Sequence, residues 1–236
     1  MRTRLRSAAG TFLAATVAGL VLVAVFGSAA SAGPRSGRVA TAGNPVVPAG
    51  GTVAGKGYAY WLERSWRVYI TVKTPAPCLT VSVGGARVAM LLGPPNSLSG
   101  SSTCSEPAGR AMYVPQVSWV CSTVKEDLGT GATPADLEKC ARGRFESGTI
   151  GVPSRDVLDG HPIDWHKLVT ATDAFYVSKP VSAIVNAPAP AAYVAAYGSG
   201  LLLRDLPKGT HTIHFTMAAA QNGGQSVNLT YTIHVS

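Results

Sequence analysis

Alternating hydrophobic and polar residues dominate the second half of the chain and predict β-strands. In the segment 210–217, Ile213 and Phe215 fall on one face of a strand, whereas Thr212 and His214 fall on the other. Similar short segments, separated by turns rich in glycine, proline and asparagine, recur at 79–83, 87–92, 112–120, 149–152, 168–171, 174–177, 183–185, 191–197, 201–204 and 227–235. Eight or more such strands predict a mainly β protein, an antiparallel β-sandwich or jelly-roll-like single domain.

Two segments instead show the periodicity of helices. Over 58–69, steps of 100° place Trp61 and Leu62 on an apolar arc and Glu63 and Arg64 on the opposite one. From Trp66 onward the same residues also alternate as in a half-buried strand, so a change from helix to strand near residue 68 is an alternative. A second, short helix is predicted near 134–145, because Thr133 suits an N-cap and the proline that follows suits the first helical position.

The first 54 residues predict export and a flexible lead. Three arginines, an apolar run over 11–26 and the sequence Ala-Ser-Ala at 30–32 predict a signal peptide over 1–32, with an uncleaved anchor as the alternative. No cysteine follows directly to suggest a lipoprotein, and no later apolar run is long enough to be a transmembrane segment. Residues 33–54 are rich in glycine, proline and alanine and predict a flexible lead, so the folded domain is expected over 55–236.

The chain is mildly basic. The chain has 20 lysines and arginines against 12 acids, and the predicted signal removes three arginines, which leaves a net charge of +5. The basic residues are scattered, whereas nucleic-acid binding usually shows a dense basic stripe. We therefore expect no nucleic-acid partner.

Four cysteines, Cys78, Cys104, Cys121 and Cys140, lie in the predicted exported part. An even number in an oxidising compartment predicts two disulfides, and three pairings are possible. Sequential pairing, Cys78 with Cys104 and Cys121 with Cys140, is preferred because it closes two short loops. The spacing lacks the close pairs of a zinc site, so no metal is expected on these thiols.

Three stretches together resemble a family of uncharacterised secreted bacterial proteins. They are the aromatic segment from Tyr60 to Trp66, the block that runs from Val88 through Cys104 and the Pro-x-Gly-x-Ala sequence to Cys121, and Leu-Pro-Lys-Gly-Thr-His-Thr-Ile-His-Phe at 206–215 with the last strand. The resemblance implies a Trp-rich N-terminal helix, a β-sandwich body and a location outside the cell. It implies no catalytic residue and no cofactor.

Two groups of side chains are candidates for metal binding. His214 and His234 would meet if their strands paired suitably, although two histidines on a solvated sheet face are the simpler interpretation. The cluster Asp159, His161, Asp164 and His166 places four ligand-type groups within eight residues, but a polar turn between strands explains it as well. No metal site is therefore predicted.

No sequence motif of a known catalytic mechanism is present, including GxSxG, Walker A, HExxH, GxGxxG and CxxC. Ser199 lies between two glycines but lacks the first glycine of a nucleophile elbow. A glycosidase pair of carboxylates could be drawn from Glu106, Glu126, Asp159 and Asp164, and nothing in the sequence selects one pair.

Aromatic residues are concentrated near the start of the predicted domain. Tyr60, Trp61 and Trp66 would bind a sugar or a partner if exposed, or form the contact between helix and sheet if buried, and Tyr60 falls on the polar arc. The sequence thus predicts a secreted, non-catalytic binding protein whose partner is a cell-wall polymer, a carbohydrate or another protein. A secreted hydrolase with an unrecognised site and a structural envelope protein are the alternatives.

Overall fold

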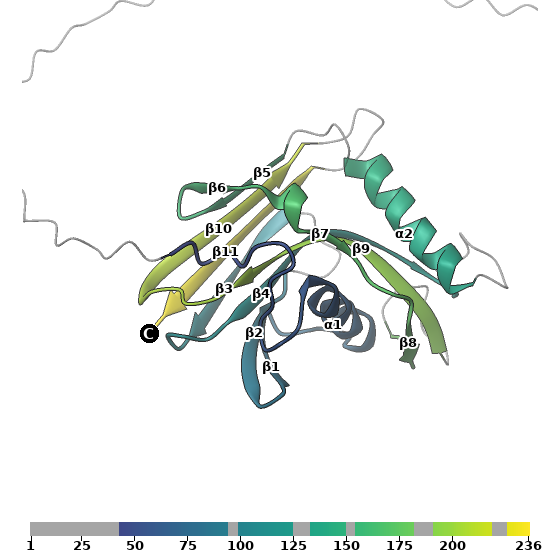
Figure 1. Ribbon diagram of the computed structural model, residues 1–236, viewed down its shortest axis with the longest axis horizontal. Coiled ribbons are helices and arrows are strands. Elements are labelled where there is room, and N and C mark those ends of the chain that lie inside the picture. The colour runs from purple at the N-terminus through teal and green to yellow at the C-terminus, as the bar shows by residue number, and fades with distance from the viewer. Residues whose placement is uncertain (1–42, 94–98, 125–132, 150–153, 182–190, 219–225) are drawn as a thin grey trace, which may run out of the picture. The chain divides into compact units, whose positions relative to one another are not determined.

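The computed structural model describes residues 43–93, 99–124, 133–149, 154–181, 191–218 and 226–236, and these form two packed β-sheets with two α-helices (Figure 1). The strands of the six-stranded sheet are β1 (Cys78–Val83), β2 (Ala86–Leu91), β4 (Met112–Ser122), β9 (Ala191–Leu203) and β7 (Val169–Ala171) in that order, with β8 (Phe175–Ser178) also paired to β9. Those of the five-stranded sheet are β3 (Ser99–Glu106), β11 (Val227–Val235), β10 (Gly209–Met217), β5 (Ser154–Leu158) and β6 (His161–Ile163). The predicted β-sandwich is confirmed.

Two of the strand pairs are parallel, which the prediction of an antiparallel sandwich did not include. β3 runs parallel to β11 over its whole length, and β2 runs parallel to β4 at Ala89 and Met90. Neither pair is joined by a hairpin turn, and a short turn is what forces neighbouring strands to run in opposite directions. The other strand pairs among the described residues are antiparallel.

Strand β9 is a single strand of 13 residues where the sequence predicted two strands around a glycine turn. A Cβ atom on Gly200 would lie 2.5 Å from the Tyr113 hydroxyl oxygen, so the glycine leaves room for that side chain instead of making a turn. The strands β3, β5 and β6 were missed, because serine, glycine and proline within them hide the alternation. The predicted strand at 149–152 is wrong at Thr149, which ends a helix, and its other residues lie outside the described ones, as do those of 183–185.

The first helix, α1 (Tyr58–Thr71), continues past the point where the alternative placed a strand. The Val72 amide still donates to the Val68 carbonyl, and Ile70 is fully buried. The predicted apolar arc is confirmed, since Tyr58, Trp61, Leu62 and Ser65 are also buried. The local pattern near residue 68 was compatible with a helix or a strand, and packing of the apolar arc against the sheet stabilises the helix.

The second helix, α2 (Pro134–Thr149), covers the face of the six-stranded sheet opposite to α1. Val194 of β9 packs with Ile70 of α1, whereas the next residue, Ala195, packs with Leu137 and Ala141 of α2. Successive side chains of a strand point to opposite faces, so the two helices lie on opposite sides of this sheet, as Figure 1 shows. None of the helices among the described residues is long and apolar enough to cross a membrane.

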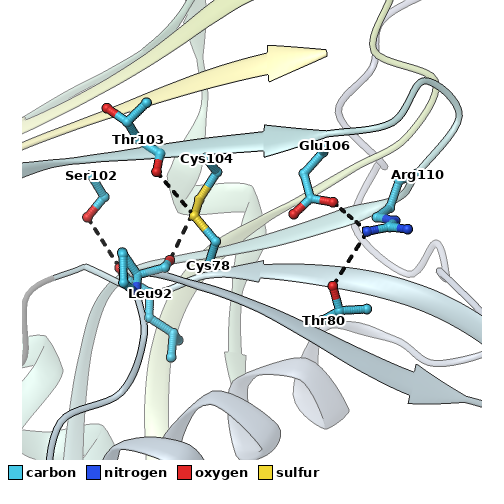
Figure 2. The surroundings of a disulfide bond; sticks show 9 residues. Cys78, Thr80, Leu92, Ser102, Thr103, Cys104, Glu106 and Arg110 are labelled. Carbon is cyan, nitrogen blue, oxygen red and sulfur yellow. Dashed lines mark hydrogen bonds and ion pairs between the residues drawn. A yellow bond between two sulfur atoms is a disulfide. The ribbon is translucent and has the colours of Figure 1, made fainter. Parts of the chain in front are cut away.

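Both predicted disulfides, Cys78–Cys104 and Cys121–Cys140, are present with the predicted pairing. The first joins β1 to β3, which are edge strands of the two different sheets, and the second ties α2 to β4. Near the first disulfide, Arg110 also links β1 and β3, as Figure 2 shows. Its guanidinium binds Glu106 of β3 at 2.7 Å and lies 3.5 Å from Thr80 of β1. The opposite edges of the two sheets, β6 and β7, are joined by the chain itself, which runs from β6 through a 3-10 turn (Trp165–Leu168) into β7. The two sheets are therefore connected at both edges.

The ordered fold begins before residue 55, which corrects the predicted lead over 33–54. Val46 forms a β-bridge with Leu203, the Val47 amide donates to the Leu202 carbonyl at 2.8 Å, and Val47 and Val53 are buried. Composition missed this segment because it is held by pairing with the end of β9 and not by its own hydrophobic pattern. The signal peptide over 1–32 and residues 33–42 of the lead lie outside the described residues.

Candidate functional site

A groove of about 740 Å³ opens between three segments that are distant in the sequence. One wall is the N-terminal segment 44–49, the second is the turn from β5 through β6 into the 3-10 turn, and the third is the turn between β9 and β10. The third wall includes Leu206, Pro207 and His211 of the Leu-Pro-Lys-Gly-Thr-His stretch that the sequence singled out. We call this the 44–49 groove.

The walls of the 44–49 groove are mainly apolar. Its lining side chains include four prolines, Pro45, Pro48, Pro162 and Pro207, and the aliphatic residues Val46, Leu158, Ile163, Leu168 and Leu206. Its volume lies within the range of about 300 to 1,000 Å³ that is usual for small-molecule sites. Apolar walls with few polar groups are typical of such sites.

His211 is the most constrained polar group of the groove. Its Nδ1–H donates to Asp159 Oδ2 at 2.6 Å, and its Nε2–H donates to the Pro207 carbonyl at 2.8 Å. Because both partners are acceptors, this geometry favours the imidazole with protons on both ring nitrogens, which is its positively charged form. Burial works against this charge, but the hydrogen bonds to Asp159 and Pro207 outweigh burial and raise the pKa of His211 above its usual value.

This arrangement positions the two turns that carry Asp159 and Pro207. The second carboxylate oxygen of Asp159 accepts a hydrogen bond from the Thr212 amide at 2.7 Å, so both of its oxygens are occupied. We infer that this pair holds the β5–β6 turn against the β9–β10 turn.

The remaining ionisable groups lie at the rim. Asp164 and Lys167 form an exposed ion pair at 3.0 Å, and hydrogen bonding to Lys167 lowers the pKa of Asp164. His161 is exposed, and its imidazole makes no hydrogen bond with the described residues. His161 is therefore the one histidine of the groove that has free ring nitrogens for a ligand.

The predicted cluster at 159–166 comes together only in part. Asp159, His161 and Asp164 line the groove, whereas His166 stacks on Trp165 with ring centroids 3.9 Å apart and is not among the lining residues. The described residues contain no group of three or more His, Cys, Asp or Glu side chains placed to hold a metal ion.

The two histidines proposed to meet across strands do not do so. In the register of β10 and β11, His214 lies opposite Thr230 and His234 lies opposite Thr210. Each imidazole has its own local partner, since His214 lies 3.0 Å from Asn228 Oδ1 and His234 lies 3.0 Å from Thr210 Oγ1. The simpler interpretation, histidines on a solvated face, agrees with their exposure.

Of the candidate nucleophile and carboxylates, Asp159 and Asp164 line the groove, and the others do not among the described residues. Ser199 is fully buried in the middle of β9, where no substrate reaches its hydroxyl. Glu106 is buried and paired with Arg110. Glu126 lies outside the described residues.

The predicted binding aromatics belong to the core contact of α1. Trp61 is fully buried and donates through its indole nitrogen to the Lys56 carbonyl at 3.1 Å, so it cannot stack on a ligand. Tyr60 is half-buried against Trp61, and Trp66 is half-buried and donates to Ser118 Oγ. The large exposed aromatics of the described residues are instead Trp119, Tyr176 and Tyr193. Tyr176 was not singled out from the sequence: alternation with Phe175 and Val177 could have placed it on the outward face, but could not have shown that this face stays uncovered.

Comparisons with known proteins add little to this geometry. No model of a known protein family matches the chain, and no curated protein matches it. Among solved structures, the search finds the solution structure of Amebosin at 10% sequence identity, with 58% of this chain and 96% of that chain covered and a TM-score of 0.22. At that TM-score the likeness identifies neither the fold nor an activity.

Proposed function

We propose that the protein is secreted and acts as a non-catalytic binding protein that holds a ligand in the 44–49 groove. The observation that carries this proposal is a preformed, apolar groove in which His211 and Asp159 are engaged with each other and with the backbone. Two disulfides support an oxidising compartment, in agreement with the signal peptide that the sequence predicts.

The lining supports one chemical class of ligand. Proline rings and aliphatic side chains favour an apolar group, and the charges of the groove are balanced in the pairs His211–Asp159 and Lys167–Asp164. We therefore expect an uncharged or weakly polar molecule whose apolar part enters the groove, with His161 available for one hydrogen bond at the rim.

A direct test uses the uncharged, apolar fluorescent probe N-phenyl-1-naphthylamine with the natively folded protein. We expect saturable binding that Ala49→Arg weakens, because Ala49 is an exposed lining residue and the longer side chain would obstruct the groove. Ala86→Arg is the matched control, since Ala86 is exposed at the start of β2 and does not line the groove. Equal binding by both variants, or no saturable binding by the wild type, would contradict the assignment of the groove as the site.

A further inference from the structure

Two tyrosines form a cross-strand pair at the edge of the six-stranded sheet, away from the 44–49 groove. Tyr176 of β8 lies directly opposite Tyr193 of β9, and their ring centroids are 5.5 Å apart at an angle of 65°. Their exposed fractions are 50% and 49%, the highest of the large hydrophobic side chains among the described residues. Figure 1 shows β8 well separated from β5 and β6, which border the groove.

The residues paired next to these tyrosines on the same face, and Thr123 beside Tyr193, are small or carry hydroxyl groups. The next pair on the same face is Ser178 with Ala191, and Ser178 is exposed. On the other side of Tyr193, the Thr123 hydroxyl accepts a hydrogen bond from the Tyr193 amide at 3.1 Å, which leaves the hydroxyl proton of Thr123 free to donate. No large side chain of these neighbours covers the tyrosine rings. We call Tyr176, Tyr193, Ser178 and Ala191 the tyrosine platform.

The cover provided by α2 ends just before the tyrosine platform. Leu137 and Ala141 of α2 pack on Ala195, and the Arg142 guanidinium lies over the Tyr197 ring at 4.7 Å. Both Ala195 and Tyr197 share the outward face of β9 with Tyr193, but Tyr193 remains half exposed. The helix therefore buries the middle of this face and leaves its aromatic end open.

We propose that the tyrosine platform binds pyranose rings of an uncharged polysaccharide. A tyrosine ring offers an apolar face for the C–H groups of a sugar and a polar hydroxyl at its edge, which matches the two sides of a pyranose. The Ser178 and Thr123 hydroxyls lie at the border of the pair and can bind sugar hydroxyl groups. None of the four platform side chains is charged at neutral pH, and the Glu138 carboxylate accepts a hydrogen bond from the nearby Ala174 amide at 3.2 Å, so the platform favours a neutral polymer over an anionic one.

This proposal concerns a second site and does not depend on the 44–49 groove. It is tested by native affinity electrophoresis of the disulfide-bonded protein in gels that contain hydroxyethyl cellulose, soluble starch or galactomannan. We expect retarded migration in at least one gel. Tyr176→Ala and Tyr193→Ala should each weaken the affinity about tenfold, the lower end of the effect that loss of an aromatic ring has where nucleic-acid bases stack on it.

Three control variants make the result specific. Tyr176→Phe keeps the stacking face and should remain within about threefold of the wild type, because only an edge hydroxyl is lost. Val72→Ala removes an equally exposed apolar side chain at the end of α1 and should change nothing. Ala49→Arg should bind the polysaccharide normally while it loses the fluorescent probe, which separates the two sites.

Several outcomes would overturn the proposal. They are normal migration of the wild type in all three gels, equal retardation of both alanine variants and the wild type, and a loss in Val72→Ala as large as the loss in Tyr176→Ala. Thermal unfolding of each variant is measured alongside, and Tyr176→Phe serves for the comparison if Tyr176→Ala fails to fold. In that case a Phe variant that has lost retardation would contradict stacking as the basis of binding.

Discussion

Asp156 is a buried acid whose replacement by asparagine should stabilise the protein at neutral pH. Its side chain on β5 is 1% exposed and faces the interior of the sandwich beside Phe215. Gln116 Nε2 donates to one carboxylate oxygen at 2.5 Å, and the other carboxylate oxygen has no hydrogen-bond partner, as is also true of Gln116 Oε1. Burial raises the pKa of Asp156 to about 6, although hydrogen bonding to Gln116 and to the Val157 backbone lowers it.

The magnitude follows from the difference between the folded and unfolded pKa. The pKa of the Asp156 carboxyl rises from 3.8 in the unfolded chain to about 6 in the folded protein. A shift of one pKa unit corresponds to about 1.4 kcal/mol. Because the folded state holds the proton more tightly, stability is highest below pH 4 for this group and falls as the pH rises through 6. At pH 7 to 8 the ionised side chain therefore costs about 3 kcal/mol of the free energy of unfolding.

Asp156→Asn keeps the shape of the side chain and removes the ionisation. Its amide oxygen can accept the hydrogen bond from Gln116 Nε2, and its NH₂ group can donate to Gln116 Oε1. We expect the free energy of unfolding of the variant to exceed that of the wild type by up to about 3 kcal/mol at pH 7 to 8. Near pH 4 the two free energies should be almost equal.

The assay is urea unfolding with disulfides intact at pH values from 4 to 8, analysed by linear extrapolation. Asp173→Asn is the matched control, because Asp173 is an exposed aspartate. A variant that is less stable than the wild type at pH 7, or an advantage that does not shrink toward pH 4, would refute the reasoning. A pH-dependent gain of the same size in Asp173→Asn would refute it as well.

Three further predictions follow from other contacts. His211→Gln should destabilise the protein most below pH 6.5, where the charged imidazole contributes fully to stability. The difference in the free energy of unfolding between wild type and variant, measured with urea, should decrease as the pH rises through the raised pKa of His211. A difference that does not depend on pH would contradict the charged state. Trp61→Ala should cost about 3 to 5 kcal/mol in the same assay because the side chain is fully buried, and a cost near zero would contradict its place in the core. The double variant Cys78→Ala, Cys104→Ala should lower the free energy of unfolding by about 3 kcal/mol. Thiol titration of the denatured, unreduced wild type should find no free thiol. Two or more free thiols would contradict the two disulfides.

Local patterns in the sequence predicted most elements because those elements depend on residues close together in the chain. The amphipathic arc of α1 and the Thr-Pro start of α2 are readable within one or two turns of helix, and β10 and β11 alternate over nine residues each. The disulfides were also predictable, since short loops between successive cysteines favour sequential pairing. β3, with its serines and a glycine, shows no such pattern, and its strand exists through pairing with β11.

Which side chains meet and which stay exposed was decided only by the tertiary structure. The sequence marked Asp159 and His161 as a polar cluster, but the partner that engages Asp159 is His211, 52 residues further along and on the inner face of β10. The sequence also gathered its aromatic candidates around Trp61, which the packing of α1 buries, while Tyr176 and Tyr193 stay exposed because α2 covers only the neighbouring part of their face. A local pattern sets the element and the face of a residue, whereas exposure depends on what another part of the chain places against that face.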